Sequence, residues 1–409
     1  MTDIRRTVDA VWRIDGAQVV ATLVRVTGDV GLAQDLAQDA VADALKQWPS
    51  SGVPRNAGAW LTAVAKRKAV DAWRRQQTQE EKYRTIAHDL SEITEDEWQP
   101  IEDDVLRLVF MACHPVLSRQ AQVCLTLRAV GGLTTEEIAR MMLVPISTVQ
   151  QRIVRAKATL AASHVRFSTP EPTEWAERLG AVLGVVYLIF TEGYAATAGD
   201  RWMRTDLAHE ALRLGRVLAR LLPREPEVHG LVALMELQAS RFAARVDPDG
   251  TPVLLADQDR GRWDRAQIRR GRAALARVDE LGRGRGSFAL QASIAECHAV
   301  AHSIEETDWD RIVVIYEALG RIAPSPIVDL NRAVAVSMTS AGPGPALRIV
   351  DHLAERGELK DSPLLPSVRG ELLSQLGRTE EARTELTAAA QMSRNEREAQ
   401  VLRSKAARL

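Results

Sequence analysis

The chain has 409 residues and a formal net charge of −1, so it is too long for one compact core and is not basic overall. Its three cysteines, Cys113, Cys124 and Cys297, have no metal-like spacing, which argues against a disulfide framework and favours a reducing, cytoplasmic compartment. The first residues lack an apolar signal core and no stretch approaches the roughly 20 apolar residues of a membrane span, so we expect no membrane segment.

Apolar residues recur at three- and four-residue spacing along the whole chain, and this periodicity predicts an all-α protein. Stretches rich in proline, serine or acidic residues interrupt it at residues 49–54, 86–100 and 168–174. These breaks divide the chain into four pieces. A further irregular stretch, residues 245–262, interrupts the C-terminal half and is long enough to be functional or mobile.

The helix expected over residues 31–48 carries aspartates one turn apart, at Asp35, Asp39 and Asp43. Like charges four residues apart on a helix repel each other, so this edge costs stability unless a cationic partner lies against it. The pattern therefore indicates a docking edge for a basic partner. An acidic edge that is simply solvated is the alternative interpretation.

The helix expected over residues 56–77 combines packing residues with clustered cations. Its basic side chains and the tryptophans between them are Lys66, Arg67, Lys68, Arg74, Arg75, Trp60 and Trp73. Cations beside aromatic rings hold phosphates and stack on unpaired bases, as binding of single-stranded nucleic acid requires. Core packing of both tryptophans is the alternative. Residues 86–104, in contrast, hold eight acids and neither lysine nor arginine, so charge is sharply segregated along the chain.

Residues 133–160 predict two short helices joined by a tight turn at Val144 and Pro145. A capping box is expected at the start of each helix, formed by Thr134 with Glu137 and by Ser147 with Gln150. On the second helix, one apolar stripe is predicted to be buried against the first helix. Its members are Val149, Ile153, Ala156 and Leu160, facing Ile138, Ala139 and Met142.

The opposite face of this second helix is polar and cationic, with Thr148, Gln151, Arg152, Arg155 and Thr159. A face of this width fits a DNA major groove, where arginine and glutamine pair bidentately with base edges. The sequence thus predicts a helix-turn-helix that reads double-stranded DNA. An ordinary helical hairpin with a solvated basic face remains the alternative.

The order of these segments resembles the sigma-70 superfamily of RNA polymerase sigma factors, and specifically its extracytoplasmic-function (ECF) group. Residues 35–40 (DLAQDA), 59–75 and 133–157 carry the resemblance. It assigns residues 1–80 to sigma region 2, 81–104 to an acidic linker that threads toward the polymerase active-site channel, and 105–166 to sigma region 4. Sigma factors are not enzymes, so the resemblance implies no catalytic residue, no cofactor and no metal.

The resemblance also implies roles for individual positions. Core RNA polymerase would be bound through its β′ clamp, by Asp35, Leu36, Asp39 and Asp43, and through its β flap. The −10 element and its opened strand would be taken by Trp60, Lys66, Arg67, Trp73, Arg74 and Arg75. The −35 element would be read by Thr148, Gln151, Arg152, Arg155 and Lys157.

The C-terminal part, residues 167–409, resembles the ECF branch that carries a tetratricopeptide-like domain, on the blocks CHPVL, LIFTEGYAA, LLADQDRGRWD, ALQASIAECHA and LNRAVAV. Gly370, Ala382 and Ala389 match the small-residue positions of such a repeat, with Leu376 and Gly377 at the inter-helix turn. A second repeat would begin with Trp309, Tyr316, Leu319 and Gly320. We expect a degenerate α-solenoid that controls activity by binding a protein or another part of the chain, with no membrane partner.

Two rival functions are also compatible with the sequence. A one-component regulator would read an operator with the helix-turn-helix and sense a ligand with the C-terminal domain. A metal-dependent hydrolase would place zinc between His298 and His302, which are four residues apart on one expected helix with Glu296 and Cys297 beside them. The sequence places no third ligand there, so packed helix histidines are the favoured interpretation.

Overall fold

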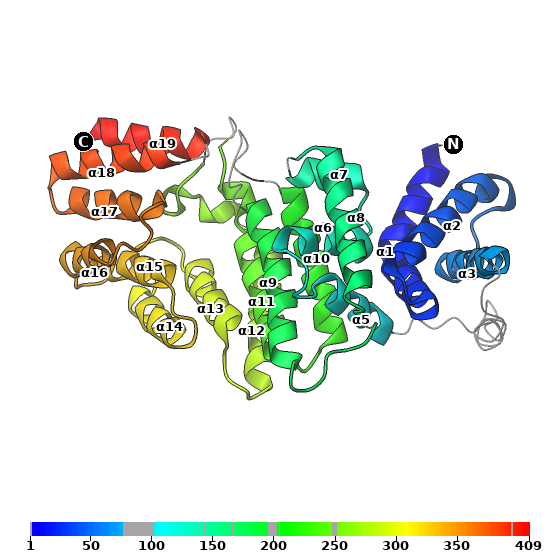
Figure 1. The fold of residues 1–409 in the computed structure, drawn as a ribbon. Coiled ribbons are helices and arrows are strands. Elements are labelled where there is room, and N and C mark those ends of the chain that lie inside the picture. The colour runs from blue at the N-terminus through cyan, green and yellow to red at the C-terminus, as the bar shows by residue number, and fades with distance from the viewer. Residues whose placement is uncertain are drawn as a thin grey trace. The chain divides into compact units, whose positions relative to one another are not determined.

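The structure is a computed structural model, and it describes residues 2–76, 102–142, 144–165, 167–194, 203, 205–247, 252–393 and 396–409. Within these ranges helices dominate, and the only β-type pairing is an isolated bridge between Val246 and Pro252 (Figure 1). The predicted all-α fold class is confirmed. The chain divides into two compact units, Met1–Leu188 and Ile189–Leu409.

Unit 1 begins with a bundle of three helices whose buried faces meet in one core. Asp29 starts the second helix, because its Oδ1 accepts hydrogen bonds from the backbone N–H groups of Gly31 and Leu32 at 2.5 and 3.1 Å. Gly52 ends that helix with φ +79°, a conformation that favours glycine. The bundle consists of α1 (Thr2–Thr27), α2 (Val30–Ser51) and α3 (Ala57–Gln76).

Four shorter helices follow in unit 1: α5 (Glu102–Ala112), α6 (Arg119–Ala129), α7 (Thr135–Met142) and α8 (Ile146–Ala162). The capping box predicted for α7 is confirmed. Backbone N–H of Thr134 donates to Glu137 Oε2 at 2.8 Å, and backbone N–H of Glu137 donates to Thr134 Oγ1 at 3.1 Å. The second predicted box is wrong, because Pro145 with φ −58° is the N-cap residue and Ser147 already lies inside the first turn of α8, which has no side-chain cap.

Helix α9 (Trp175–Tyr194) runs across the boundary between the units, and unit 2 continues as helices that pack mostly on their sequence neighbours, except that α13 packs mainly on α11. Consecutive packing of this kind is the α-solenoid-like arrangement expected from the sequence. The helices are α10 (Thr205–Leu221), α11 (Pro226–Ala239), α12 (Arg265–Glu280), α13 (Ser287–Val300), α14 (Trp309–Ile322), α15 (Pro326–Ser337), α16 (Pro343–Glu355), α17 (Leu364–Gln375), α18 (Thr379–Met392) and α19 (Glu396–Arg408). Three single-turn 3-10 helices connect α11 to α12: η1 (Phe242–Ala244), η2 (Leu255–Asp257) and η3 (Arg260–Arg262).

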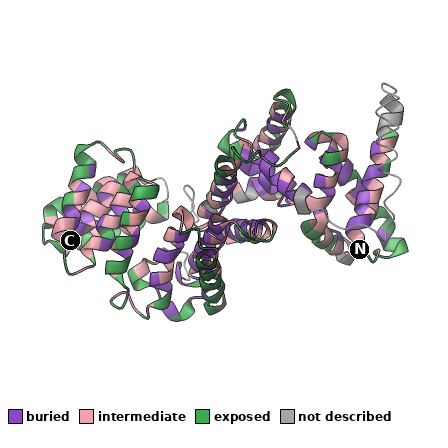
Figure 2. Ribbon diagram, turned by 90° about the horizontal axis from the view of Figure 1, so that it is seen from below, coloured by how far each residue is buried: buried purple, intermediate pink, exposed green. Residues whose placement is uncertain are grey.

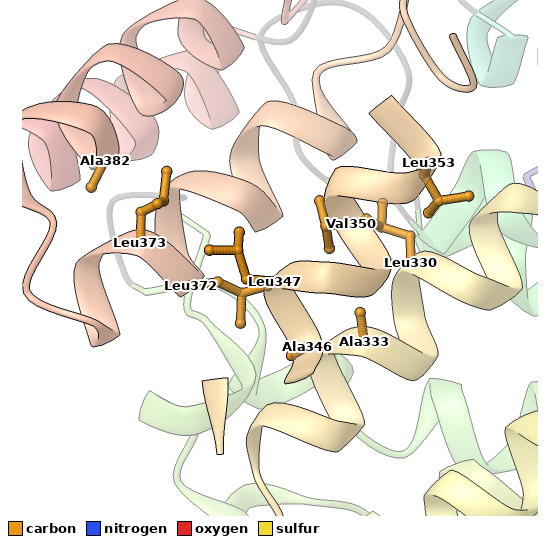
Figure 3. Packing of buried hydrophobic residues seen from close by; sticks show 9 residues of the cluster. All are labelled: Leu330, Ala333, Ala346, Leu347, Val350, Leu353, Leu372, Leu373 and Ala382. Atoms are coloured by element: carbon orange, nitrogen blue, oxygen red, sulfur yellow. The ribbon is translucent and has the colours of Figure 1, made fainter. Parts of the chain in front are cut away.

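The last hairpins of unit 2 share one apolar core (Figure 3). It joins α15, α16, α17 and α18 through Leu330, Ala333, Ala346, Leu347, Val350, Leu353, Leu372, Leu373 and Ala382. Helices α17 and α18 approach closely at Gly370, where an added Cβ would lie 2.8 Å from Leu386 Cγ. Ala382 and Ala389 are fully buried, and Gly377, with φ +73°, forms the predicted turn. Gly320 makes no turn, because α14 continues to Ile322.

Throughout the described residues, most helices bury one face and expose the other. Figure 2 shows buried residues along one side of most helices and exposed residues along the other. Such amphipathic helices each hide one stripe against a neighbour, as the three- and four-residue periodicity predicts. No helix in the described part of the chain has the length and apolar character needed to cross a membrane.

Candidate nucleic-acid and protein interfaces

The rotation of α8 about its own axis is fixed by its apolar stripe. Val149, Ile153, Ala156 and Leu160 are all buried, as predicted, and they pack toward α6 and α7. At about 100° per residue, the positions diametrically opposite this stripe are Ser147, Gln151, Val154 and Ala158. All four are exposed. A shallow groove on this face is lined by Ser147, Gln150, Gln151, Val154 and Arg155.

The five residues predicted for duplex recognition differ in their surroundings. Gln151 and Arg155 are exposed in the groove, whereas Thr148 is half-buried. Arg152 is also half-buried and reaches back to α6, where its charge and hydrogen bond lower the pKa of the Cys124 thiol against the larger, raising effect of burial. Lys157 lies at the other edge of α8 and is half-buried too.

The sequence analysis did not assign Ser147, Gln150 or Val154 to the recognition face. Val154 is 64% exposed, which is unusual for a valine on a helix that has a buried stripe available. The signal was present, since the direction opposite the stripe passes through Ser147 and Val154. The charged residues on which the predicted recognition face was based place the centre of that face nearer to Arg152.

The acidic edge of α2 is divided between the surface and the bundle interior. Asp35 and Asp39 are exposed, whereas Leu36 is only 5% exposed and belongs to the core. Asp43 accepts a hydrogen bond from Lys68 Nζ at 2.8 Å, and this bond is the main cause that raises the pKa of Lys68. One carboxylate therefore has its cationic partner within the bundle, and two remain on the surface.

The cations and tryptophans of α3 also separate by position. Arg67 is exposed, but Lys66 is 7% exposed, and burial, followed by the charge of Arg25 on α1, lowers its pKa. Trp60 is half-buried, with its ring centroid 5.4 Å from that of the fully buried Trp48 at an interplanar angle of 63°. Trp73, Arg74 and Arg75 belong to α3, but their side chains lie outside the described residues, as do residues 77–101 of the predicted acidic linker.

Within unit 1 the three-helix bundle contacts the helix-turn-helix. Trp12 Nε1 on α1 donates a hydrogen bond to Gly132 O at 3.1 Å, and Arg13 Nη2 lies 3.0 Å from Glu137 Oε1. At the other end of the contact, Lys157 Nζ lies 3.9 Å from Asp35 Oδ1. Burial lowers the pKa of Lys157, and the Asp35 carboxylate opposes that shift. The residue predicted to meet polymerase and a residue predicted to meet DNA thus face each other.

Arg25 makes a further link to the start of α5. Its Nε lies 2.9 Å from Asp104 Oδ2, and Arg107 Nη1 lies 2.7 Å from Asp104 Oδ1. The Asp104 side chain is 2% exposed, so these two arginines compensate a buried charge. Asp104 is the last residue of the predicted acidic linker, and in the structure it is an anchor point on the bundle.

The zinc hypothesis loses its geometric basis. Helix α13 ends at Val300 and Ala301 is extended, so His302 does not share a helix face with His298, and that prediction is wrong. His298 is buried edge-on against Trp309, with 5.1 Å between ring centroids. Burial, with the charges of Arg241 and Arg260, lowers its pKa to about 3. The described residues hold no group of three potential metal ligands, and Cys113, Cys124 and Cys297 are buried free thiols.

Comparison with known proteins assigns the segments separately. Residues 15–79 match a model of sigma-70 region 2, and residues 107–160 match a model of sigma-70 region 4. Residues 178–279 match a family of unknown function, DUF6596.

Relatives exist over the whole chain and over part of it. An uncharacterised protein of Rhizobium meliloti is 43% identical over 394 residues, which is 94% of this chain and 92% of that protein. Proteins described as probable ECF RNA polymerase sigma factor SigI in two strains of Mycobacterium tuberculosis are 28% identical over 173 residues, 41% of this chain and 58% of theirs. No solved structure matches significantly.

Proposed function

The chain belongs to the sigma-70 family, in its extracytoplasmic-function group, and from that premise we propose that it directs transcription initiation by docking region 2 and region 4 on core RNA polymerase at a promoter. Members of this family are non-catalytic transcription factors whose partners are core polymerase and promoter DNA. The observation that carries the proposal is the matched pair of regions in this order. The exposed groove on α8, which presents Gln151 and Arg155, supports it.

Promoter discrimination at the −35 element is assigned to the groove of α8. Gln151 and Arg155 have the hydrogen-bonding groups that pair with adenine and guanine edges, and both are exposed. Thr148, Arg152 and Lys157 flank the groove, where they would contact backbone phosphates. Phosphate contacts set the register on the duplex, whereas base contacts specify the sequence.

The −10 element and core polymerase are assigned to the bundle. Arg67 supplies an exposed cation for phosphates, and half-buried Trp60 offers one ring edge near the loop between α2 and α3. We assign the same element to Trp73, Arg74 and Arg75. Lys66 is buried, so it would support this surface from inside the bundle. Asp35 and Asp39 would dock on the basic β′ clamp, while Leu36 and Asp43 hold α2 in place for that contact.

Binding of polymerase and promoter requires the two regions to separate. The Lys157 side chain is 22% exposed and lies 3.9 Å from Asp35, so Lys157 would reach DNA only after the two regions separate. The contact includes the Trp12 hydrogen bond and two ion pairs that are at least partly exposed, each contributing about 1 kcal/mol or less. Helix α1 also packs on α5, where Arg25 pairs with the buried Asp104. A polymerase surface that binds both regions at a distance from each other would open it.

Control of this activity is assigned to the C-terminal helical domain. Its helices pack consecutively, and repeat arrays of this kind present a long concave surface for a peptide or another domain. The partner would be a protein, either a separate chain or another segment of this one.

Pull-down of core polymerase tests the proposal. The Asp35→Ala, Asp39→Ala double variant should bind much less polymerase than the wild type, because it removes both exposed carboxylates of the docking edge. The matched control is Asp9→Ala, an exposed aspartate on α1 of the same bundle, which should bind normally. Wild-type protein that ignores polymerase but binds a specific duplex unaided would instead establish the one-component regulator.

A further inference from the structure

Val154 is the most exposed large apolar side chain of α8. It is 64% exposed, although Ile153, one position before it, belongs to the buried stripe of the helix. A β-branched side chain loses rotational freedom in a helix and, when it is not buried, gains no apolar contact in return. Single exposed apolar residues are common on proteins, so the side chains around Val154 decide what its exposure means.

The side chains around Val154 all carry hydrogen-bonding groups. The groove on α8 is lined by Ser147, Gln150, Gln151, Val154 and Arg155, and Val154 is the one apolar side chain among these five. Gln150 and Gln151 lie four and three positions before Val154, so they are its neighbours on the helix surface, and Arg155 follows it directly. The methyl groups of Val154 therefore lie beside amide and guanidinium groups within one exposed groove.

The fold of the helix-turn-helix fixes the direction of this apolar group. Val154 lies opposite the buried stripe of α8, so its side chain points away from α6 and α7. Valine has one strongly preferred rotamer on a helix, which holds both methyl groups in one orientation. Whatever fills the groove must either present an apolar group to Val154 or leave the valine facing polar atoms.

The major groove of DNA offers one apolar group, the C5 methyl group of thymine. The other features of the base edges in that groove are hydrogen-bond donors and acceptors, which glutamine and arginine side chains complement. A protein groove that combines amide and guanidinium groups with one apolar centre therefore has the chemistry to contact a thymine next to bases that are recognised by hydrogen bonds.

On the basis of the proposed function, we infer that Val154 contacts the C5 methyl group of one thymine in the −35 element and makes α8 select thymine at that position. Gln151 and Arg155 bind hydrogen-bonding base edges nearby. Val154 adds a contact that cytosine does not provide, because cytosine has no C5 methyl group. The contact removes valine and thymine methyl groups from water together, and burial of one methyl group corresponds to about a fourfold change in affinity.

Replacement of thymine by deoxyuridine tests this contact, because it removes the C5 methyl group and keeps every hydrogen-bonding group of the base. The probe is a promoter duplex that the polymerase holoenzyme selects from a pool randomised over the −35 element. Each thymine of the selected element is replaced in turn, and binding of the holoenzyme is measured by fluorescence anisotropy. With the wild type, replacement at one position should weaken binding about fourfold. With Val154→Ala, the same replacement should have little effect, because the shortened side chain no longer reaches the methyl group.

The matched control is Val116→Ala, which should keep the effect of deoxyuridine seen with the wild type. Val116 is 41% exposed, on the turn between α5 and α6 of the same region, and it is not part of the groove. Two results would overturn the inference: replacement of each thymine without effect on the wild-type holoenzyme, or a loss of binding that persists unchanged in Val154→Ala. A holoenzyme that binds no promoter duplex at all would overturn the proposed function, and this inference together with it.

Discussion

At the scale of single residues, direction around a helix decides which side chains are available. Arg152 and Arg155 are three positions apart on α8, yet Arg155 is exposed in the groove and Arg152 reaches toward Cys124. A count of cations on a sequence treats the two alike. Because their neighbours in the fold differ, the proposed function places Arg155 on base edges and Arg152 beside the DNA backbone.

Arg155→Ala should therefore cost about 1 to 3 kcal/mol of discrimination between the preferred −35 sequence and a variant with one base pair changed. Arg152→Ala should weaken binding to both sequences by a similar factor. Fluorescence anisotropy of polymerase holoenzyme on the paired duplexes measures both effects. The assignment fails if Arg152, rather than Arg155, proves to set the ratio.

His298 should make folding of the chain sensitive to mild acid. Burial, with Arg241 and Arg260, holds its pKa at about 3 in the folded protein, against 6.5 for an ordinary histidine. Below pH 6.5 the unfolded chain binds a proton that the folded chain does not, so stability is lost as pH falls from that value toward 3. Between pH 7 and 5 the loss is about 2 kcal/mol.

Urea unfolding at the two pH values measures this loss. His298→Phe keeps an aromatic ring against Trp309 and has no titrating group, so its free energy of unfolding should fall by about 2 kcal/mol less than that of the wild type. Equal pH dependence in the two proteins would show that His298 is protonated in the fold.

At the scale of helices, contact distance between neighbours is set by small residues. Gly370→Ala would place a Cβ 2.8 Å from Leu386 Cγ and 3.2 Å from Ala382 O, so α17 must move away from α18. We expect a destabilisation of about 1 to 3 kcal/mol in thermal or urea unfolding. Gly344→Ala, in the first turn of α16 with no atom near its Cβ, is the control and should be neutral or slightly stabilising.

Local signals in the sequence predict helices well where a side chain caps a backbone group. The Thr134 and Glu137 box and the apolar stripe of α8 are both read from spacing and both confirmed. The start of α8 and the end of α13 were misjudged, because Pro145 and Ala301 set them through backbone conformation rather than through a side-chain pattern. Helix ends without a capping side chain carry a weak signal.

The burial of polar side chains by tertiary packing could not be predicted from the sequence. Lys66 lies in the same run of cations as Arg67, and only the packing of α1 against α3 separates the buried residue from the exposed one. Arg260 belongs to a block noticed as a motif, but the carbonyl groups that it binds, at His298 and Ala301, lie about 40 positions away. Contacts between distant segments leave no periodic trace.

At the scale of the whole molecule, the three-helix bundle of unit 1 is held against the helix-turn-helix. The Trp12 to Gly132 hydrogen bond and the Arg13 to Glu137 ion pair join the two regions that, under the proposed function, polymerase would separate. Any free energy in these contacts is subtracted from the free energy of polymerase binding.

Loosening the contact should strengthen binding of core polymerase. The Trp12→Phe, Arg13→Ala double variant lacks one hydrogen bond and one exposed ion pair, worth about 1 kcal/mol together, so affinity should rise about fivefold. Titration of labelled polymerase measures it, and Arg5→Ala, an exposed arginine on α1, serves as the control. An unchanged affinity would mean that the regions already separate in the free protein.

The consecutive packing of α14 to α19 has a consequence for how the chain folds during synthesis. Each of these helices finds its main contact in a helix next to it in the sequence, so a growing chain can complete one hairpin before the next is made. Low sequence separation between contacts favours rapid folding. We therefore expect this tail to assemble hairpin by hairpin as it leaves the ribosome, without waiting for a distant segment.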